Sequence, residues 1–442
     1  MSDYYLHTTS DIITRGVAKN VIRSYVKKYL FSLINGLSSE RFGFNTVDRI
    51  SIEVKKFYDD LYEDEIMYID SAGYSIIVGD IPPTQINPFI DCYIYFLEKY
   101  CETYCDHIFS LDIPIFLKHP DFNTYSNLYK RNYRSNQLMK HTLDQNPVLY
   151  DKIVYVYQFK ISEQYEIWNR IYDEFWANED RLKHFALGGL VSVRGVTGIK
   201  FSPYLGMLYK LLHIVSKKNL KEESILHILG IYGIHDRFHL MFLQQLFNDI
   251  YLKDQNCSVQ LSYDTINYFV SGLFKIRDLD SIIPQDNGSY ICDLNNNLID
   301  QMDKIVLYPD ALQAIKDNIS CLHNKSALCD TRVYCYLNVI RQLLSDQIMR
   351  EVIDKHDLVN QFLEFDTFNS LKNNMKPLFL NLEKIYPFVF RNYTDKIMNN
   401  FKWIHSFHKW WTSGRDENRL EKGIELFIKH INFPKAINDD RG

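Results

Sequence analysis

Short apolar segments alternate with helical segments along most of the chain, and this alternation is the feature that most constrains the fold. Repeated strand–helix units form parallel sheets, and eight units favour a closed barrel over an open doubly wound sheet. The sequence therefore predicts an α/β protein with a (β/α)8 TIM-type barrel. The expected strands are 4–9, 66–70, 107–113, 152–159, 184–191, 225–231, 257–263 and 270–276.

Helices are expected between these strands. The four-residue spacing of apolar positions across 17–33 predicts the first, which should end near Gly36. Others should begin at Asn87-Pro88, Ser162, Ser202-Pro203 and Asp236, where capping residues stand. After about residue 290 the segments look helical, with no clear strand. We expect two regions, a barrel over 1–290 and a mainly helical C-terminal region over 291–442.

The composition limits the classes of function. The chain has 442 residues, of which 46% are hydrophobic, so it can bury a sizeable core. Its formal net charge is −5, so any nucleic acid must bind to a local basic patch. The start, MSDYYLHTTSD, does not resemble a signal peptide, and no apolar run approaches the roughly 18 residues of a membrane span. We expect a soluble cytoplasmic protein with no membrane partner, in the host cytoplasm if a phage encodes it, and with reduced cysteines.

Polar or glycine residues stand at the carboxyl ends of the expected strands. In a barrel these ends meet at one mouth, where active sites lie. Three carboxylates and one amide would meet there. The alternative is that each Asp caps the next helix. The residues concerned are Asp70, Asp112, Gln158, Gly188, Gly189, Gly230 and Asp264.

The segments around these residues resemble, in order, the motifs of the tRNA-guanine transglycosylases. IDSAGYS resembles the Asp-Ser-Gly-Gly-Phe-Gln motif, and SLDIP and VYQF resemble the segments that recognise guanine. FALGGLV resembles the Gly-Gly-Leu strand, HILGI the strand that follows it, and QLSYDT the segment with the nucleophile. The similarity covers about residues 60–275.

The resemblance implies a base-exchange reaction through a covalent glycosyl intermediate. Asp264 would be the nucleophile, and Asp70 would carry protons for the leaving and entering bases. The remaining residues would bind the base, through side chains that hydrogen-bond its edge, backbone groups beside a glycine, and an aromatic ring that stacks. They are Ser71, Tyr74, Asp112, Gln158, Gly189 and Leu190.

The sequence departs from the family pattern in two ways. Ala72, Tyr74 and Ser75 replace Gly, Phe and Gln of the first motif, and the Cys-x-Cys-x-x-Cys zinc signature is missing. We favour the interpretation that the cysteines are buried free thiols, so no cofactor is expected. An irregular zinc site is the alternative. Its ligands would come from Cys292, Cys321, His323, Cys329 and Cys335.

The absence of the zinc signature favours DNA over tRNA as the nucleic-acid substrate. The chain is most like the DpdA-type DNA-guanine transglycosylases, which insert 7-deazaguanines into DNA. Its expected partners are therefore DNA, or tRNA as the alternative, and a 7-deazaguanine base. Barrels of this family often pair, so a homodimer is one expected assembly.

A basic and aromatic segment at 125–141 is the expected nucleic-acid contact, with a solvated loop as the alternative. Arg194, after the Gly-Gly-Leu strand, would contact a phosphate, the substrate or a mouth carboxylate. The Trp-rich run 401–415 fits a core or interface better than DNA. The basic residues of the contact are Lys130, Arg131, Arg134, Lys140 and Arg194.

Three other functions compete with the DNA enzyme. The same chemistry on tRNA would be indicated by a zinc site in 291–442. A non-catalytic nucleic-acid-binding subunit is disfavoured because Asp70 and Asp264 are both present. An unrelated metal-dependent barrel would need His or Glu beside the three strand-end Asp residues.

Overall fold

Eight parallel strands form a closed ring in the computed structural model. Each strand pairs with its neighbours in chain order, and β8 pairs with β1 to close the ring. The strands are Tyr4–His7 (β1), Lys28–Ser32 (β2), Ile66–Asp70 (β3), His107–Phe109 (β4), Ile153–Gln158 (β5), His184–Gly188 (β6), Glu223–Ile228 (β7) and Ser258–Thr265 (β8). The structure describes residues 4–7, 23, 26–33, 42–159, 161–189, 201–218, 223–231, 234–255, 257–265, 345–390 and 392–431.

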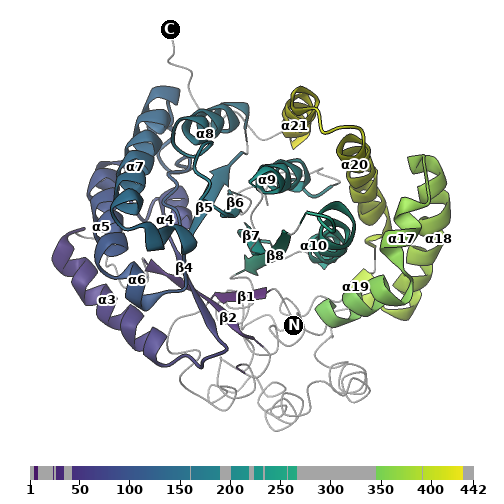
Figure 1. Ribbon diagram of the computed structural model, residues 1–442, viewed down its shortest axis with the longest axis horizontal. Coiled ribbons are helices and arrows are strands. Elements are labelled where there is room, and N and C mark those ends of the chain that lie inside the picture. The colour runs from purple at the N-terminus through teal and green to yellow at the C-terminus, as the bar shows by residue number, and fades with distance from the viewer. Residues whose placement is uncertain are drawn as a thin grey trace.

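Helices surround the strands on the outside (Figure 1). They follow β2 to β7, whereas residues 8–22 after β1 and 266–344 after β8 lie outside the described residues. The helices are Phe44–Asp59 (α3), Gly73–Val78 (α4), Ile86–Lys99 (α5), Cys101–Tyr104 (α6), Tyr125–Gln145 (α7), Ser162–Phe175 (α8), Leu205–Lys217 (α9) and Ile234–Gln245 (α10), which continues as π-helical turns at Leu246–Tyr251. The predicted α/β class is confirmed.

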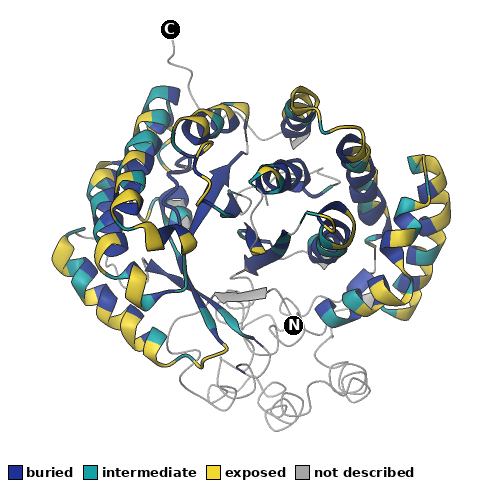
Figure 2. Ribbon diagram, in the orientation of Figure 1, coloured by how far each residue is buried: buried dark blue, intermediate teal, exposed yellow. Residues whose placement is uncertain are grey.

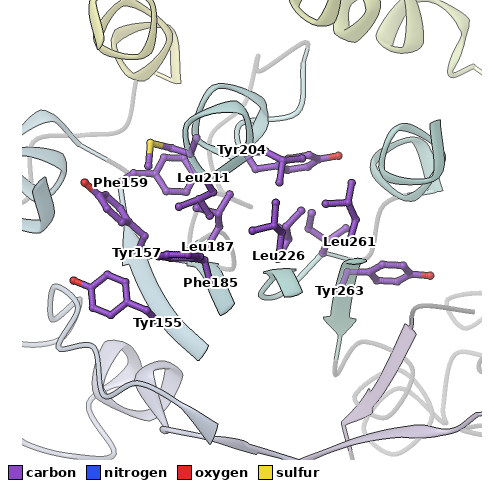
Figure 3. Close-up of a cluster of buried hydrophobic side chains, with 14 of the residues drawn as sticks. Tyr155, Tyr157, Phe159, Phe185, Leu187, Tyr204, Leu211, Leu226, Leu261 and Tyr263 are labelled. Carbon is purple, nitrogen blue, oxygen red and sulfur yellow. The ribbon is translucent and has the colours of Figure 1, made fainter. Parts of the chain in front are cut away.

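Side chains alternate between the inside of the ring and the helix-facing side. In β3, Met67 and Ile69 pack toward the helices, whereas Tyr68 belongs to a separate interior cluster with Phe109 and Val156. The strands whose burial is described are mostly buried, and the helices expose their outer faces (Figure 2). The period of two therefore directs every second residue of a strand into the ring. Figure 3 shows helix-facing side chains of β5 to β8 beside residues of the α9 region, among them Tyr155, Tyr157, Phe185, Leu187, Tyr204, Leu211, Leu226, Leu261 and Tyr263.

The helix predicted over 17–33 is wrong for its second half, although Arg23 is helical. Lys28–Ser32 is β2, paired with both β1 and β3. Tyr29 and Phe31 pack toward the helices, and Leu30 faces the interior. A spacing of four is also a multiple of two, so the pattern that suggested a helix equally fits one face of a strand.

Other boundaries differ from prediction in smaller ways. The strand predicted at 107–113 ends at Phe109, and β8 extends past 263 to include Asp264. The predicted strand 270–276 lies outside the described residues, and the ring closes without it. The polar segment 125–141 is not a loop but part of α7, capped by the Thr124 side chain.

The described part of the C-terminal region, 345–431, is helical, as predicted. α20 and α21 lie against the helices of the barrel: α20 contacts α9 and α10, and α21 contacts α8 and α9. No helix in the described ranges is both long and apolar enough to cross a membrane. The named helices here are Leu358–Leu363 (α17), Phe368–Ile385 (α18), Pro387–Phe390 (α19), Thr394–Thr412 (α20) and Glu417–Ile431 (α21).

Candidate active site

Four of the sequence-predicted polar residues come together at the carboxyl ends of the strands. Asp70 ends β3, Gln158 ends β5, and Asp264 stands one residue before the end of β8. Asp112 follows β4 in the loop that leads to α7. The charges of Asp264 and Asp112 both act on Asp70, and Gln158 hydrogen-bonds Asp112. The site is therefore a ring of three carboxylates and one amide.

The pKa of the Asp70 carboxyl group lies well above its ordinary value. Burial first, then the charges of Asp264 and Asp112, raise its pKa to about 7. The Ser32 hydroxyl lies 3.3 Å from its Oδ2, and the backbone N–H of Ala72 partly opposes the rise. α4 begins at Gly73, and no side chain caps it. Asp70 is therefore not the cap of this helix. A carboxyl group with a pKa near 7 can both give and take a proton at neutral pH.

Asp112 and Gln158 form a second, buried half of the site. The Gln158 amide Nε2 donates to Asp112 Oδ2, and the Ser71 hydroxyl lies 3.3 Å from Asp112 Oδ1. Gln158 is 2% exposed, and its Oε1 has no hydrogen-bond partner among the described residues. A buried acceptor without a partner is costly. This pair can therefore accept hydrogen bonds from a ligand's N–H groups.

Two glycines leave the space that these side chains occupy. A Cβ on Gly188 would lie 2.5 Å from Gln158 Nε2 and 2.9 Å from Val156 Cγ1. A Cβ on Gly73 would lie 3.1 Å from Asp112 Oδ1. Gly189 has a φ of +89°, a conformation that favours glycine. The Gly-Gly pair of the sequence thus serves both side-chain placement and backbone geometry.

Ala72 occupies the position at which the resembling family has its second glycine. Its φ is +70°, in the left-handed region. That conformation costs a residue with a Cβ about 1–2 kcal/mol. The Asp70 turn therefore retains the backbone shape of a glycine turn although a methyl group is present.

The loop that carries Asp112 is held by side-chain amides. Asn132 of α7 donates to Ile113 O at 2.9 Å and accepts from Ile113 N at 2.8 Å. Asn123 makes the same pair of bonds with Phe116. These bonds replace a strand partner for the loop backbone, so α7 positions Asp112.

Asp264 is anchored by its neighbours on β7. Its Oδ1 accepts from the Gly230 backbone N–H at 3.0 Å and lies 3.1 Å from His227 Nε2. His227 Nδ1 lies 2.9 Å from the Ser262 hydroxyl. The sequence prediction missed His227 and Ser262. The sequence carries only a partial signal for them: a histidine interrupts an apolar strand, and Ser262 shares the strand face of Asp264, but the pairing of the two strands is needed to bring them together.

Several predicted site residues cannot be placed. Leu190, Arg194 and the five candidate zinc ligands Cys292, Cys321, His323, Cys329 and Cys335 lie outside the described residues. Tyr74 is in α4, but its side chain is not described. Across the described residues, no three His, Cys, Asp or Glu side chains are grouped to hold a metal ion.

The predicted nucleic-acid residues lie along one helix, α7. Lys130 is exposed, whereas Arg134 pairs with Asp91 at 2.6 Å and Lys140 pairs with Asp144 at 2.6 Å. Arg131 lies over the Phe116 and Phe122 rings. Lys140 is ten residues after Lys130, so it lies about 15 Å further along the helix from the mouth. These positions leave Lys130 and Arg131 as the basic side chains nearest the mouth on this helix.

The other sequence candidates are structural. In α20, Phe407, Trp410 and Trp411 are buried, as the core interpretation predicted. His235 pairs with Asp236, and the His239 ring bonds the His235 carbonyl. Cys101 and Cys105 are buried free thiols whose sulfur atoms lie 3.3 Å apart.

A groove of about 890 Å³ lies between α8 and α21, and no residue of the carboxylate ring lines it. Its charged lining is mostly acidic, and several of these acids already bond to the protein: Glu421 pairs with Lys210, and Glu166 accepts from Tyr125. An acidic lining does not suit a phosphate backbone. The ring of carboxylates at the mouth is therefore the better candidate site.

Comparisons with known proteins add no family. A search of protein-family models and of curated proteins finds none that matches this chain. The class of the protein thus follows from its own fold and site, an α/β protein whose parallel strands carry a carboxylate ring at their carboxyl ends.

Proposed function

We propose that this chain is a (β/α)8 base-exchange glycosyltransferase that replaces guanine in DNA by a 7-deazaguanine. The observation that carries the proposal is the carboxylate ring: an Asp70 with a pKa near 7 beside Asp264, and a buried Asp112–Gln158 pair. The eight strands paired in order support the barrel assignment. The order of the strand-end motifs in the sequence supports the reaction class.

The first step forms a covalent intermediate. Asp264 attacks the anomeric carbon C1′, and the bond from C1′ to N9 of guanine breaks. The protonated form of Asp70 gives its proton to the leaving purine. Asp70 is well suited to this step, because at pH 7 about half of a group with a pKa near 7 is protonated.

The second step reverses the first with a new base. N9 of the 7-deazaguanine attacks C1′ and expels the Asp264 carboxylate, while the N9 proton passes to Asp70. One base has entered, one has left, and Asp70 is protonated again. The site thus needs no external acid, base or oxidant.

The buried Asp112–Gln158 pair would recognise the base. An ionised Asp112 accepts from the N–H groups of a guanine-like edge, and the Gln158 amide both accepts and donates. Gln158 Oε1, which lacks a partner among the described residues, would accept one such N–H. Guanine and 7-deazaguanine share this edge, so one pair serves both the leaving and the entering base.

DNA is favoured over tRNA by the sequence, which lacks the zinc signature that accompanies tRNA handling in the resembling enzymes. A base inside a duplex must be flipped out or presented on a single strand. Lys130 and Arg131, in the second turn of α7, are suited to a local phosphate contact. The local contact is needed because the chain as a whole is acidic.

A guanine-release assay tests this function. The protein is incubated with DNA or tRNA that carries labelled guanine, a 7-deazaguanine is added, and label release is followed, with Asp264→Asn alongside. Release from DNA that Asp264→Asn abolishes is the expected result. Release of guanine from tRNA alone would overturn the assignment of DNA as the substrate. No release from either nucleic acid by folded protein would overturn the enzyme assignment in favour of a binding subunit.

A further inference from the structure

His227 lies inside the barrel at the base of the proposed site. It is fully buried on β7, and the Phe109 ring packs against it with centroids 4.9 Å apart. His227 and Ser262 are directly opposite each other in the β7–β8 pairing, and Asp264 is two residues further along β8 on the same face. The backbone ladder therefore fixes the imidazole between Ser262 and Asp264.

The hydrogen bonds define the tautomer of this imidazole. An ionised carboxylate only accepts, so the ring must carry its proton on Nε2, 3.1 Å from Asp264 Oδ1. Nδ1 is then an acceptor, and the Ser262 hydroxyl, 2.9 Å away, donates to it. Ser262 thus holds His227 in the tautomer that donates to Asp264.

The imidazole acts as a neutral donor. Burial lowers the pKa of His227, with a smaller contribution from the charge of Lys28 in the same direction, although the Asp264 carboxylate opposes them. Asp70 and Asp112 are the other carboxylates of the ring, and Asp70 feels the charges of both Asp264 and Asp112. A neutral donor favours the ionised carboxylate by a hydrogen bond without placing a full positive charge beside the attacking group.

Both donors to Asp264 reach the same oxygen. The Gly230 N–H, like His227, ends on Oδ1. We propose that His227 is a positioning residue that, through Oδ1, directs Oδ2 of Asp264 to attack C1′. This inference rests on the proposed role of Asp264 as nucleophile.

The same bond serves both covalent steps. When Oδ2 forms its bond to C1′, Oδ1 becomes the carbonyl oxygen of the ester and still accepts from His227. When the incoming base displaces Asp264, negative charge returns to the carboxylate, and the Nε2–H group stabilises it. His227 keeps its proton throughout, so the proton balance between Asp70 and the two bases is unchanged.

The test compares His227→Phe, His227→Gln and Ser262→Ala in the full chain. Phe removes the donor but keeps a ring against Phe109, whereas the Gln amide can place an N–H near the position of Nε2. His184→Phe is the matched control, because His184 is another buried barrel histidine and bonds the Ile225 backbone rather than Asp264.

For His227→Phe we expect kcat to fall about 100-fold, the loss typical of removing one preorganised donor, with the KM for the base unchanged. Gln should recover most of kcat, and Ser262→Ala should lie between wild type and Phe. A purely structural role would lower the melting temperature without a selective loss of kcat and without rescue by Gln.

Two results would overturn the inference: a His227→Phe enzyme with the wild-type kcat, or a Gln variant as impaired as Phe. A second measurement does not depend on base exchange. NMR of ¹⁵N-labelled His227 should show a neutral ring protonated at Nε2. If wild type exchanges no base, the proposed function fails, while these spectra still test the hydrogen bond; a ring protonated at Nδ1 would refute it.

Discussion

Replacing Asp70 by Asn should abolish base exchange and yet stabilise the folded chain at alkaline pH. An unfolded Asp loses its proton near its ordinary pKa of 3.8, whereas the folded chain holds the Asp70 proton up to a pKa of about 7. Above pH 7 the folded state must carry a charge that burial, Asp264 and Asp112 all oppose. Asn keeps the shape and the acceptor oxygen for Ser32 but never carries that charge.

The size of the effect follows from the pKa displacement. Each pKa unit is worth about 1.4 kcal/mol, so a rise from 3.8 to about 7 corresponds to about 4 kcal/mol at most. Asp70 is partly exposed at the mouth, and solvent screening should reduce the observed gain to about 2 kcal/mol.

The difference in unfolding free energy between Asp70→Asn and wild type should grow as the pH rises. Below about pH 4 both states of the wild type are protonated, and the difference between wild type and Asp70→Asn should be smallest. Between pH 4 and 7 the unfolded chain has already lost the proton, so wild-type stability falls relative to the variant, and above pH 7 the gap is constant. Urea unfolding at pH 5, 6, 7 and 8 measures it.

Asp80→Asn, which changes an exposed carboxylate outside the ring, is the matched control and should alter stability by less than about 0.5 kcal/mol at each pH. A constant difference between Asp70→Asn and wild type across pH 5–8, or a loss of stability at pH 8, would refute the account of the carboxylate ring.

Three further changes test the support of the site. Gly188→Ala should raise the KM for the base at least 10-fold in steady-state exchange assays, because its Cβ would meet Gln158 Nε2 at 2.5 Å. Asn132→Ala should cost about 2 kcal/mol in urea unfolding and weaken base binding in calorimetry, since it releases the backbone that carries Asp112. Arg237→Met should cost about 3–5 kcal/mol in the same unfolding assay, because it leaves the Asp346 carboxylate buried without its cation.

Much of the α/β alternation could be predicted because strands buried on both faces appear in the sequence as short continuous apolar runs between helical segments. The failures have physical causes. In β2, apolar residues four apart fit both a helix and one face of a strand. The pairing with β3 selects the strand. α7 was not predicted as a helix because its buried face includes Asn132, Ser135 and Asn136, whose partners are elsewhere in the fold. A single sequence does not reveal which polar residues gain such partners.

Some residues of the candidate site could also be predicted from the sequence, and others could not. Asp70, Gln158 and Asp264 were predictable because the strand ends of a barrel meet at one mouth. His227 was not, since a histidine in an apolar strand is informative only once its inward face and its register with Ser262 are known. Gly188 was predicted as part of a motif, but its role in leaving space for Gln158 depends on the distance between two strands.

Trapping the covalent intermediate tests the central claim most directly. The protein would be incubated with guanine-containing DNA without an incoming base, denatured and digested, and its peptides examined by mass spectrometry. The account predicts a DNA adduct on the peptide that contains Asp264, absent in Asp264→Asn and retained in Asp80→Asn. An adduct on Asp70, an adduct formed only with tRNA, or no adduct from folded wild-type protein that binds DNA would contradict it.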